Sequence, residues 1–137
     1  MTDFNYTVNY ELELITKAVH LFSGTTIYTD APLDNNGKAS SFSPTDLVCS
    51  SLGSCMITIM GITANTHNIN LEGMNIEVTK FMTTSLPRKI SKVKVEFHFG
   101  DQKYSEKDQQ MLQNAANTCP VALSLHPDIE QEVVFNF

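Results

Sequence analysis

Three cysteines are the residues of this sequence best suited to chemistry, and two of them stand in settings that matter for a thiol. Cys55 lies near the middle of an apolar stretch, residues 43–64, and Cys119 directly precedes Pro120 at the start of a second apolar run. A thiol at a helix start lies beside unpaired backbone N–H groups, and this setting lowers its pKa. The local pattern favours plain packing for Cys55 and leaves Cys119 open between packing and reactivity.

Cys49 shares the apolar stretch with Cys55 but has no special setting of its own. About one and a half helical turns separate the two, so their side chains point away from one another and cannot pair without unwinding the helix. We interpret Cys49 as a packing residue. Three cysteines without CxxC spacing also argue against the disulfide framework of a secreted protein, and they favour a cytoplasmic location with reduced thiols.

The other residue types that could do chemistry form no rival site. The serines of the apolar stretch lack a G-x-S-x-G motif, and the sequence contains no glycine-rich phosphate loop. The histidines are scattered without the spacing of metal ligands, so we expect neither a metal nor a cofactor. They are His20, His67, His98 and His126.

Composition places the chain among ordinary globular proteins. Its 137 residues are 42% hydrophobic and 18% charged, which is typical of a single domain over residues 1–137. The net charge of −6 and the lack of a Lys/Arg cluster argue against nucleic acid binding. Polar residues within the apolar stretch and the lack of a basic flank argue against a membrane span. The N-terminus shows no signal-peptide pattern.

The apolar stretch predicts the long helix that would position Cys55. Ser43 is suited to cap it, Pro44 to its first position, and Asp46 completes a capping-box pattern. The stretch contains no Lys, Arg or Glu, so we expect a helix of roughly 30 Å that is buried on all sides. The apolar residues that recur at helical spacing are Val48, Leu52, Cys55, Met56, Ile59 and Met60.

Strands and shorter helices surround this predicted helix. Tyr6, Val8 and Tyr10 alternate with polar residues, which predicts a half-buried strand within a meander over the first thirty residues. The order of elements, with strands in runs rather than alternating singly with helices, indicates an α+β fold. The later predicted elements are a loop over 31–41, a strand pair over 73–82 and 90–100, helices over 105–118 and 120–125, and a strand over 129–137.

Two segments together resemble the OsmC/Ohr family, the osmotically inducible and organic hydroperoxide resistance proteins. The first is SPTDLVCSSLGSC, and the second is CPV-x-x-SL near the C-terminus; the upstream SGTTIYTDAP is also similar. The likeness spans nearly the whole chain in order. The positions that carry it are Pro44, Asp46, Leu47, Gly53, Cys55, Cys119, Pro120 and Val121.

The resemblance implies an OsmC-like fold, with antiparallel sheets packed on the long buried helix of an intertwined homodimer whose active sites draw on both chains. It further implies a thiol-dependent peroxidase for organic hydroperoxides. In that cycle the Cys55 thiolate attacks the terminal peroxide oxygen and becomes a sulfenic acid. Cys119 then condenses with it to a disulfide, which an external dithiol reduces.

The sequence departs from the family pattern at the groups that support the reactive thiolate. Family peroxidases place an Arg before the helix and a Glu near its start, whereas the one Arg here is Arg88, in a predicted turn. Lys17 and His20 are the alternative cations. Thr45 stands at the Glu position, with Asp46 one residue later as a supporting residue or only a helix cap. An alternative function is therefore a binding protein for small apolar ligands with little or no peroxidase activity.

Overall fold

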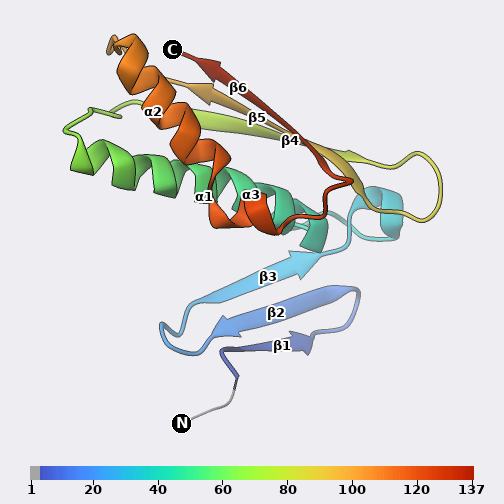
Figure 1. Ribbon diagram of the computed structural model, residues 1–137. Helices are drawn as coiled ribbons and strands as arrows, with labels where there is room; N and C mark the ends of the chain where they lie inside the picture. Colours follow the sequence, from blue (N-terminus) through green and yellow to red (C-terminus); the bar gives the residue numbers. More distant parts are fainter. Residues whose placement is uncertain (1–3) are drawn as a thin grey trace. The chain divides into compact units, whose positions relative to one another are not determined.

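The computed structural model describes residues 4–137, which form two compact units that divide between Leu47 and Val48 (Figure 1). Two three-stranded sheets and a long helix make this an α+β fold, as the sequence predicts. That the units form a single domain stays a prediction. The elements are β1 (Tyr6–Tyr10), β2 (Ile15–His20), β3 (Thr26–Asp30), η1 (Leu33–Asn35), α1 (Pro44–Thr66), β4 (Asn75–Met82), β5 (Ile90–His98), α2 (Glu106–Asn117), α3 (Pro120–Ser124) and β6 (Glu130–Asn136).

The N-terminal unit contains the first sheet, an antiparallel meander in the order β1-β2-β3. The predicted meander is therefore correct, but the predicted half-burial of β1 is not. Tyr6, Val8 and Tyr10 point to one face of the sheet and are 62%, 67% and 61% exposed. The alternation in sequence marks a face made for burial, but within residues 4–47 no second layer covers it.

The segment after β3 is folded back on Asp30, which is almost fully buried. The Asp30 carboxylate accepts hydrogen bonds from the Ser40 backbone N–H at 3.0 Å and the Ser40 hydroxyl at 2.6 Å. These bonds hold the pKa of Asp30 below its usual range. Gly37 passes so close to the Ala31 carbonyl that a Cβ would collide with it. The closed loop delivers the chain to the start of α1.

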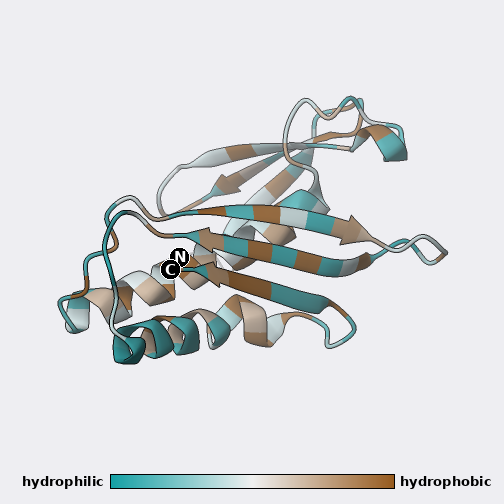
Figure 2. Cartoon of the chain, turned by 90° about the horizontal axis from the view of Figure 1, so that it is seen from above, coloured by the Kyte–Doolittle hydropathy of each residue, from teal (hydrophilic) through white to brown (hydrophobic). Residues whose placement is uncertain are grey.

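The C-terminal unit contains the second sheet, in the order β4-β5-β6. Its central strand, β5, lies in the hydrophobic core. Val93, Val95 and Phe97 of β5 are fully buried, and the Phe97 ring stacks on Phe135 of β6 at 5.0 Å. Figure 2 shows the alternation of hydrophobic and hydrophilic residues along these strands. β4 and β5 are antiparallel, but β5 and β6 are parallel. The expected antiparallel pairing therefore holds for β4 with β5 and not for β5 with β6.

The start of α1 is fixed by the predicted capping box. The Asp46 backbone N–H donates to Ser43 Oγ at 3.1 Å, and the Asp46 carboxylate accepts from the Ser43 N–H at 2.9 Å. Two of the unpaired N–H groups at the helix start are thereby satisfied. The local sequence alone is enough to set this end of the helix.

The burial of α1 differs from the prediction, because only one side of the helix is covered in the chain. The side that faces solvent carries Ser51, Ser54, Thr58 and the 58% exposed Ile62. α1 is long and apolar enough to span a membrane by length and composition, a test that the core helix of a soluble protein also passes. Its buried residues are Cys49, Leu52, Gly53, Met56, Met60 and Ala64.

Candidate functional site

Cys55 and Cys119 come together within the C-terminal unit. Cys55 lies in the middle of α1, and Cys119 is the residue before α3. The two side chains lie close enough for Cys55 to be among the groups that raise the pKa of the Cys119 thiol. Cys119 is fully buried, whereas Cys55 is partly exposed. Of the pair, Cys55 is therefore the residue more open to solution, and Cys119 is shielded from water.

The backbone around Cys119 fixes the direction of its side chain. Its N–H donates to the Ala116 carbonyl at the end of α2, and its own carbonyl accepts from the Leu123 N–H at 3.2 Å. The sulfur itself accepts from the Ala122 N–H at 3.3 Å, so Cys119 is the N-cap of α3. Pro120 occupies the first helical position, where a missing N–H costs nothing.

A side chain of the second sheet also holds α3 in place. Gln131 of β6 donates from its side-chain Nε2 to the Ala122 carbonyl at 2.9 Å. Ala122 therefore contacts the Cys119 sulfur through its N–H and the sheet through its carbonyl. Nothing in the sequence pattern singles out Gln131, because the bond depends on how α3 meets β6.

Cys55 is positioned by the close packing of α1 on β4. A Cβ added at Gly53 would lie 2.5 Å from Cδ1 of Ile76 and 2.9 Å from Cγ2 of Val78, both on β4. The helix backbone approaches the strand this closely only because residue 53 has no side chain. Leu52 and Met56 flank this contact and are fully buried. The resulting helix position fixes where the Cys55 side chain leaves α1.

The environment of Cys119 raises the pKa of its thiol, which corrects the expectation from its place at a helix start. Burial is the largest cause, since it disfavours a charged sulfur. The N–H of Ala122 acts in the opposite direction, but the hydrogen bond with Cys55 and the charge of that residue raise the pKa further. The net effect of these causes favours the protonated form of the Cys119 thiol.

Cys49 and Asp46 have structural roles in the chain. Cys49 is 2% exposed within the hydrophobic core, as a packing residue should be, and none of the three cysteines forms a disulfide. Asp46 is engaged in the capping box. Nine residues of continuous helix, a rise of about 13 Å, separate it from Cys55. Within one chain the Asp46 carboxylate therefore stabilises the helix start.

The three candidate cations lie on other elements than the two cysteines. Lys17 lies in β2, opposite Tyr28 of β3. His20 ends β2, where its Nδ1 is hydrogen-bonded to Ser23 Oγ at 2.6 Å. Arg88 lies in the exposed connection between β4 and β5. Over the same residues, no group of three or more His, Cys, Asp or Glu side chains is placed to hold a metal ion.

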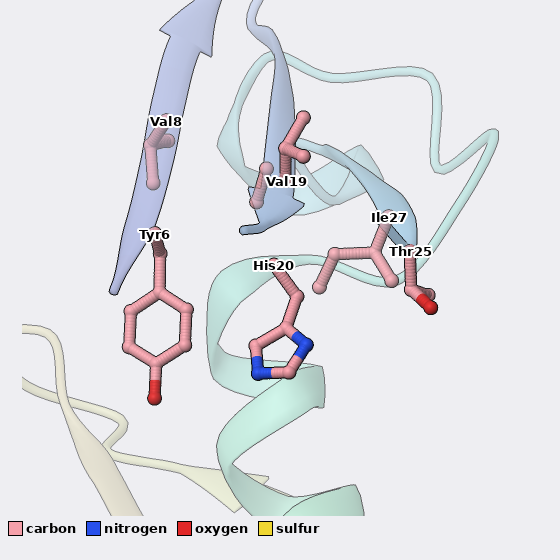
Figure 3. Close-up of a pocket in the computed structure, with 7 residues that line it drawn as sticks. Tyr6, Val8, Val19, His20, Thr25 and Ile27 are labelled. Carbon is pink, nitrogen blue, oxygen red and sulfur yellow. The ribbon is translucent and has the colours of Figure 1, made fainter. Parts of the chain in front are cut away.

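A second feature, which sequence reasoning missed, is an apolar hollow of about 360 Å³ on the first sheet (Figure 3). The rings of Tyr6 and His20 stack at 5.7 Å along one side of it. The hollow lies on the face that the alternation in β1 predicts to be buried. Its lining residues are Tyr6, Val8, Ala18, Val19, His20, Thr25 and Ile27.

Comparison with known proteins identifies the family. The family model described as OsmC-like protein matches residues 37–134, which include both cysteines of the pair. The chain belongs to this family. The matched region covers all of α1 and the second sheet up to Val134 but excludes β1, β2 and β3. Among curated proteins, none matches this OsmC-like chain.

Solved structures of OsmC/Ohr proteins share the fold. A Psychrobacter arcticus protein, named as an osmotic stress induced and detoxification response protein, is 46% identical, with a TM-score of 0.92 over 99% of this chain and 98% of that one. An organic hydroperoxide resistance protein OsmC from Legionella pneumophila is 11% identical, with a TM-score of 0.76 over 96% and 95%. The organic hydroperoxide resistance protein OhrB of Bacillus subtilis is 14% identical, with a TM-score of 0.69 over 96% of both chains.

Proposed function

We propose that this OsmC-like protein is a thiol-dependent peroxidase that reduces organic hydroperoxides through Cys55 and Cys119. The Cys55 thiolate attacks the terminal oxygen of the hydroperoxide, which breaks the O–O bond and yields an alcohol and a Cys55 sulfenic acid. Cys119 then displaces water from the sulfenic acid to form a disulfide. An external dithiol reduces that disulfide by thiol exchange and returns both thiols.

The observation that carries this proposal is the closeness of a partly exposed cysteine and a shielded one. A disulfide requires two sulfurs that approach without large backbone movement. The influence of Cys55 on the pKa of the Cys119 thiol supports such an approach before any oxidation. The partial exposure of Cys55 suits it to meet the peroxide, and the full burial of Cys119 suits it to the second step.

An organic rather than a purely inorganic peroxide fits the surroundings of the pair. The side chains packed around the core near α1 and α3 are hydrophobic, and Ile57, Ile59 and Val121 among them are only partly buried. An alkyl or aryl tail gains free energy by leaving water for such a surface. The names of the Legionella and Bacillus relatives refer to resistance to organic hydroperoxides, which supports the same substrate class.

The proposal includes a homodimer, because the chain exposes apolar surface that a second copy would cover. Val48 and Ile62 on α1 are 37% and 58% exposed, and Tyr6, Val8 and Tyr10 form an exposed row on the first sheet. Exposed apolar surface on either unit is suited to a protein interface. Size-exclusion chromatography with light scattering should give twice the mass of the 137-residue chain, whereas the mass of a single chain would contradict the dimer.

The groups that assist the Cys55 thiolate also belong to the proposal. Asp46 secures the start of the helix that carries Cys55, and Lys17, His20 or Arg88 of either chain is the candidate cation. Replacing each cation with Gln should identify the one whose loss slows peroxide reduction most. Reduced thiols at rest fit a cytoplasmic protein, because glutathione and thioredoxin keep cysteines reduced there.

The test is peroxide consumption by the purified protein with cumene hydroperoxide and dihydrolipoamide. The native protein should consume peroxide, and Cys55→Ser should abolish the reaction because serine cannot form the sulfenic acid. Cys49→Ser is the matched control, since it changes another cysteine of α1 that lies in the core, and it should retain activity in its folded fraction. Equal consumption by the native protein and Cys55→Ser would overturn the assignment.

A second candidate function is the binding of small apolar ligands without turnover, and the hollow on the first sheet favours it. The hollow presents an almost wholly apolar lining to solvent. Thermal-shift measurements with small apolar ligands test this function in a Cys55→Ala, Cys119→Ala double variant. Stabilisation of the double variant, together with no turnover by the native protein, would favour the binding protein. Turnover by the native protein favours the peroxidase.

A further inference from the structure

We infer that Gln131 is a positioning residue for Cys119, because its side-chain amide holds Ala122 of α3 so that the Ala122 N–H stays directed at the Cys119 sulfur. Two hydrogen bonds carry this inference. Gln131 Nε2 donates to the Ala122 carbonyl at 2.9 Å, and the Ala122 N–H donates to Cys119 Sγ at 3.3 Å. The inference rests on the proposed peroxidase function, in which Cys119 forms the disulfide, and it adds a residue to the second step.

Gln131 occupies a place on β6 where the sheet otherwise carries apolar side chains. It lies beside Val93 of β5, which is fully buried and belongs to the hydrophobic core. Val133 and Phe135 follow at intervals of two on the same face of β6, and both are hydrophobic and pack against that core. A polar amide on such a face costs free energy unless it is hydrogen-bonded. The bond to Ala122 offsets this cost.

α3 is too short to hold its own position. It has five residues, Pro120–Ser124, and each of them is half-buried or exposed. A single helical turn is unstable by itself, because fixing it costs more conformational entropy than its few hydrogen bonds return. Bonds from outside the helix are therefore needed to fix the direction of the Ala122 N–H. Gln131 supplies such a bond from β6, a strand that is paired along its whole length with β5.

The Ala122 N–H affects both the place and the charge of the Cys119 sulfur. Disulfide formation needs a narrow range of sulfur positions, and the attacking form is the thiolate, which a donated N–H stabilises. In that step the Cys119 thiolate forms the S–S bond and the S–O bond of the Cys55 sulfenic acid breaks, so that hydroxide leaves and takes up a proton to become water. If Ala122 moved away, Cys119 would lose its donor while it stayed fully buried.

Two substitutions separate the hydrogen bond from the space that Gln131 fills. Gln131→Met keeps a side chain of similar length but has no N–H to donate. Gln131→Glu keeps the shape, and its carboxyl group can donate to the Ala122 carbonyl only when it is protonated. An ionised carboxylate would face the carbonyl oxygen and repel it. Acid pH should therefore restore the bond in Gln131→Glu and leave Gln131→Met without it.

Gln109 provides the matched control. Its Nε2 donates to the Tyr104 carbonyl at 3.1 Å, so it makes the same kind of bond within the same unit. That bond lies at the first turn of α2, at the opposite end of this helix from Cys119. Gln109→Met and Gln109→Glu should therefore remove a comparable side-chain bond and leave the rate of disulfide formation unchanged.

The test follows the two steps of a single turnover with cumene hydroperoxide, using mass spectrometry to measure the dimedone-trapped Cys55 sulfenic acid and the disulfide between Cys55 and Cys119. Each variant's rate is divided by the native rate at the same pH, which removes the ordinary pH dependence of the thiols. We expect Gln131→Met to slow disulfide formation about fivefold, the effect of one lost hydrogen bond, at every pH, and to leave sulfenic acid formation unchanged. Gln131→Glu should slow disulfide formation at least as much at neutral pH and approach the native rate toward about pH 4–5, where its carboxyl group takes up a proton.

The failure of this inference can be told apart from the failure of the proposed function. If the native protein forms the disulfide and the Gln131 variants form it equally fast, or if acid pH does not restore Gln131→Glu, the inference is wrong and the peroxidase function stands. Equal slowing by the Gln109 variants would also overturn it, because a general loss of stability would then explain the effect. If the native protein forms no disulfide between Cys55 and Cys119, the proposed two-cysteine function itself is wrong.

Discussion

The two sheets of this protein follow the same sequence pattern and reach opposite degrees of burial. In the second sheet Val93, Val95 and Phe97 of β5 are fully buried. In the first sheet Tyr6 and Val8 of β1 alternate with polar residues just as regularly, yet each is more than half exposed. Both strands satisfy the period of two residues that marks a face for burial.

The difference comes from what each unit supplies to cover its sheet. In the C-terminal unit the buried sides of α1 and α2 join β5 in one hydrophobic core. In the described part of the N-terminal unit, residues 4–47, the apolar face of the first sheet has no such layer. A periodic pattern thus reports that a face is to be covered, and a second copy of the chain is the cover that we propose for the first sheet.

The largest effect should come from removing a ring from the covered sheet. Phe97→Ala should lower the free energy of unfolding by about 3–5 kcal/mol, because it leaves a cavity in a fully buried site. Phe22→Ala is the matched control in the N-terminal unit, where the ring is 97% exposed, and it should cost less than about 0.5 kcal/mol. Urea unfolding measures both, and equal losses would contradict the comparison.

The close approach of α1 to β4 can be tested by filling the space that Gly53 leaves. Gly53→Ala should destabilise the protein by about 1–3 kcal/mol, because its Cβ would collide with Ile76 and Val78. Gly61→Ala changes the same helix where nothing lies within 4 Å. It should stabilise the chain by about 0.5–1 kcal/mol through helix propensity. Thermal unfolding gives both values, and a stabilising Gly53→Ala would refute the packing described here.

A charge on the uncovered sheet face should change assembly more than it changes the folding of the single chain. Val8→Glu should shift the protein from dimer to monomer, while its effect on single-chain stability stays within about 0.5 kcal/mol. Asn9→Glu places the same charge on the opposite face of β1 and should leave the dimer intact. Light scattering distinguishes them. Monomers from both variants, or dimers from both, would show that the apolar face is not the interface.

The smallest effect should be on how stability depends on acid pH, to which one carboxylate in each unit contributes. The pKa of Asp30 is lowered by its bonds to Ser40, and that of Glu132 by Lys92. A lowered folded pKa contributes stability that is present above the unfolded pKa and is lost as the pH falls through the folded value. Asp30→Asn and Glu132→Gln should each reduce the loss of thermal stability between neutral and strongly acidic pH. An unchanged loss in both would contradict these assignments.

The parts of the fold that sequence alone could predict are those set by neighbours along the chain. The capping box of Ser43 and Asp46 needs only four residues, and it forms as predicted. Ser105 caps α2 through an equally short-range bond, in which its side chain accepts from the Asp108 N–H at 3.1 Å. The parallel direction of β6 could not be predicted in this way. It depends on where α2 and α3, which connect β5 to β6, return the chain to the sheet.

The candidate site likewise has features that the sequence alone predicts and features that it does not. The cysteine spacing and the cap position of Cys119 could be read from the sequence, and the family resemblance indicated the pairing. The direction in which the pKa of Cys119 shifts could not be predicted, because burial by distant parts of the chain outweighs the effect of the adjacent N–H groups. Gln131 was missed for a similar reason, since its bond to Ala122 joins elements that only the folded chain brings together.

The most direct test of the account is the bond that forms when the native protein meets an organic hydroperoxide without a reductant. Peptide mapping by mass spectrometry after one equivalent of cumene hydroperoxide should find a disulfide between Cys55 and Cys119, with Cys49 still reduced. If both thiols of the pair remain reduced while peroxide persists, or if the disulfide joins Cys49 instead, the thiol pair does not carry the chemistry assigned to it.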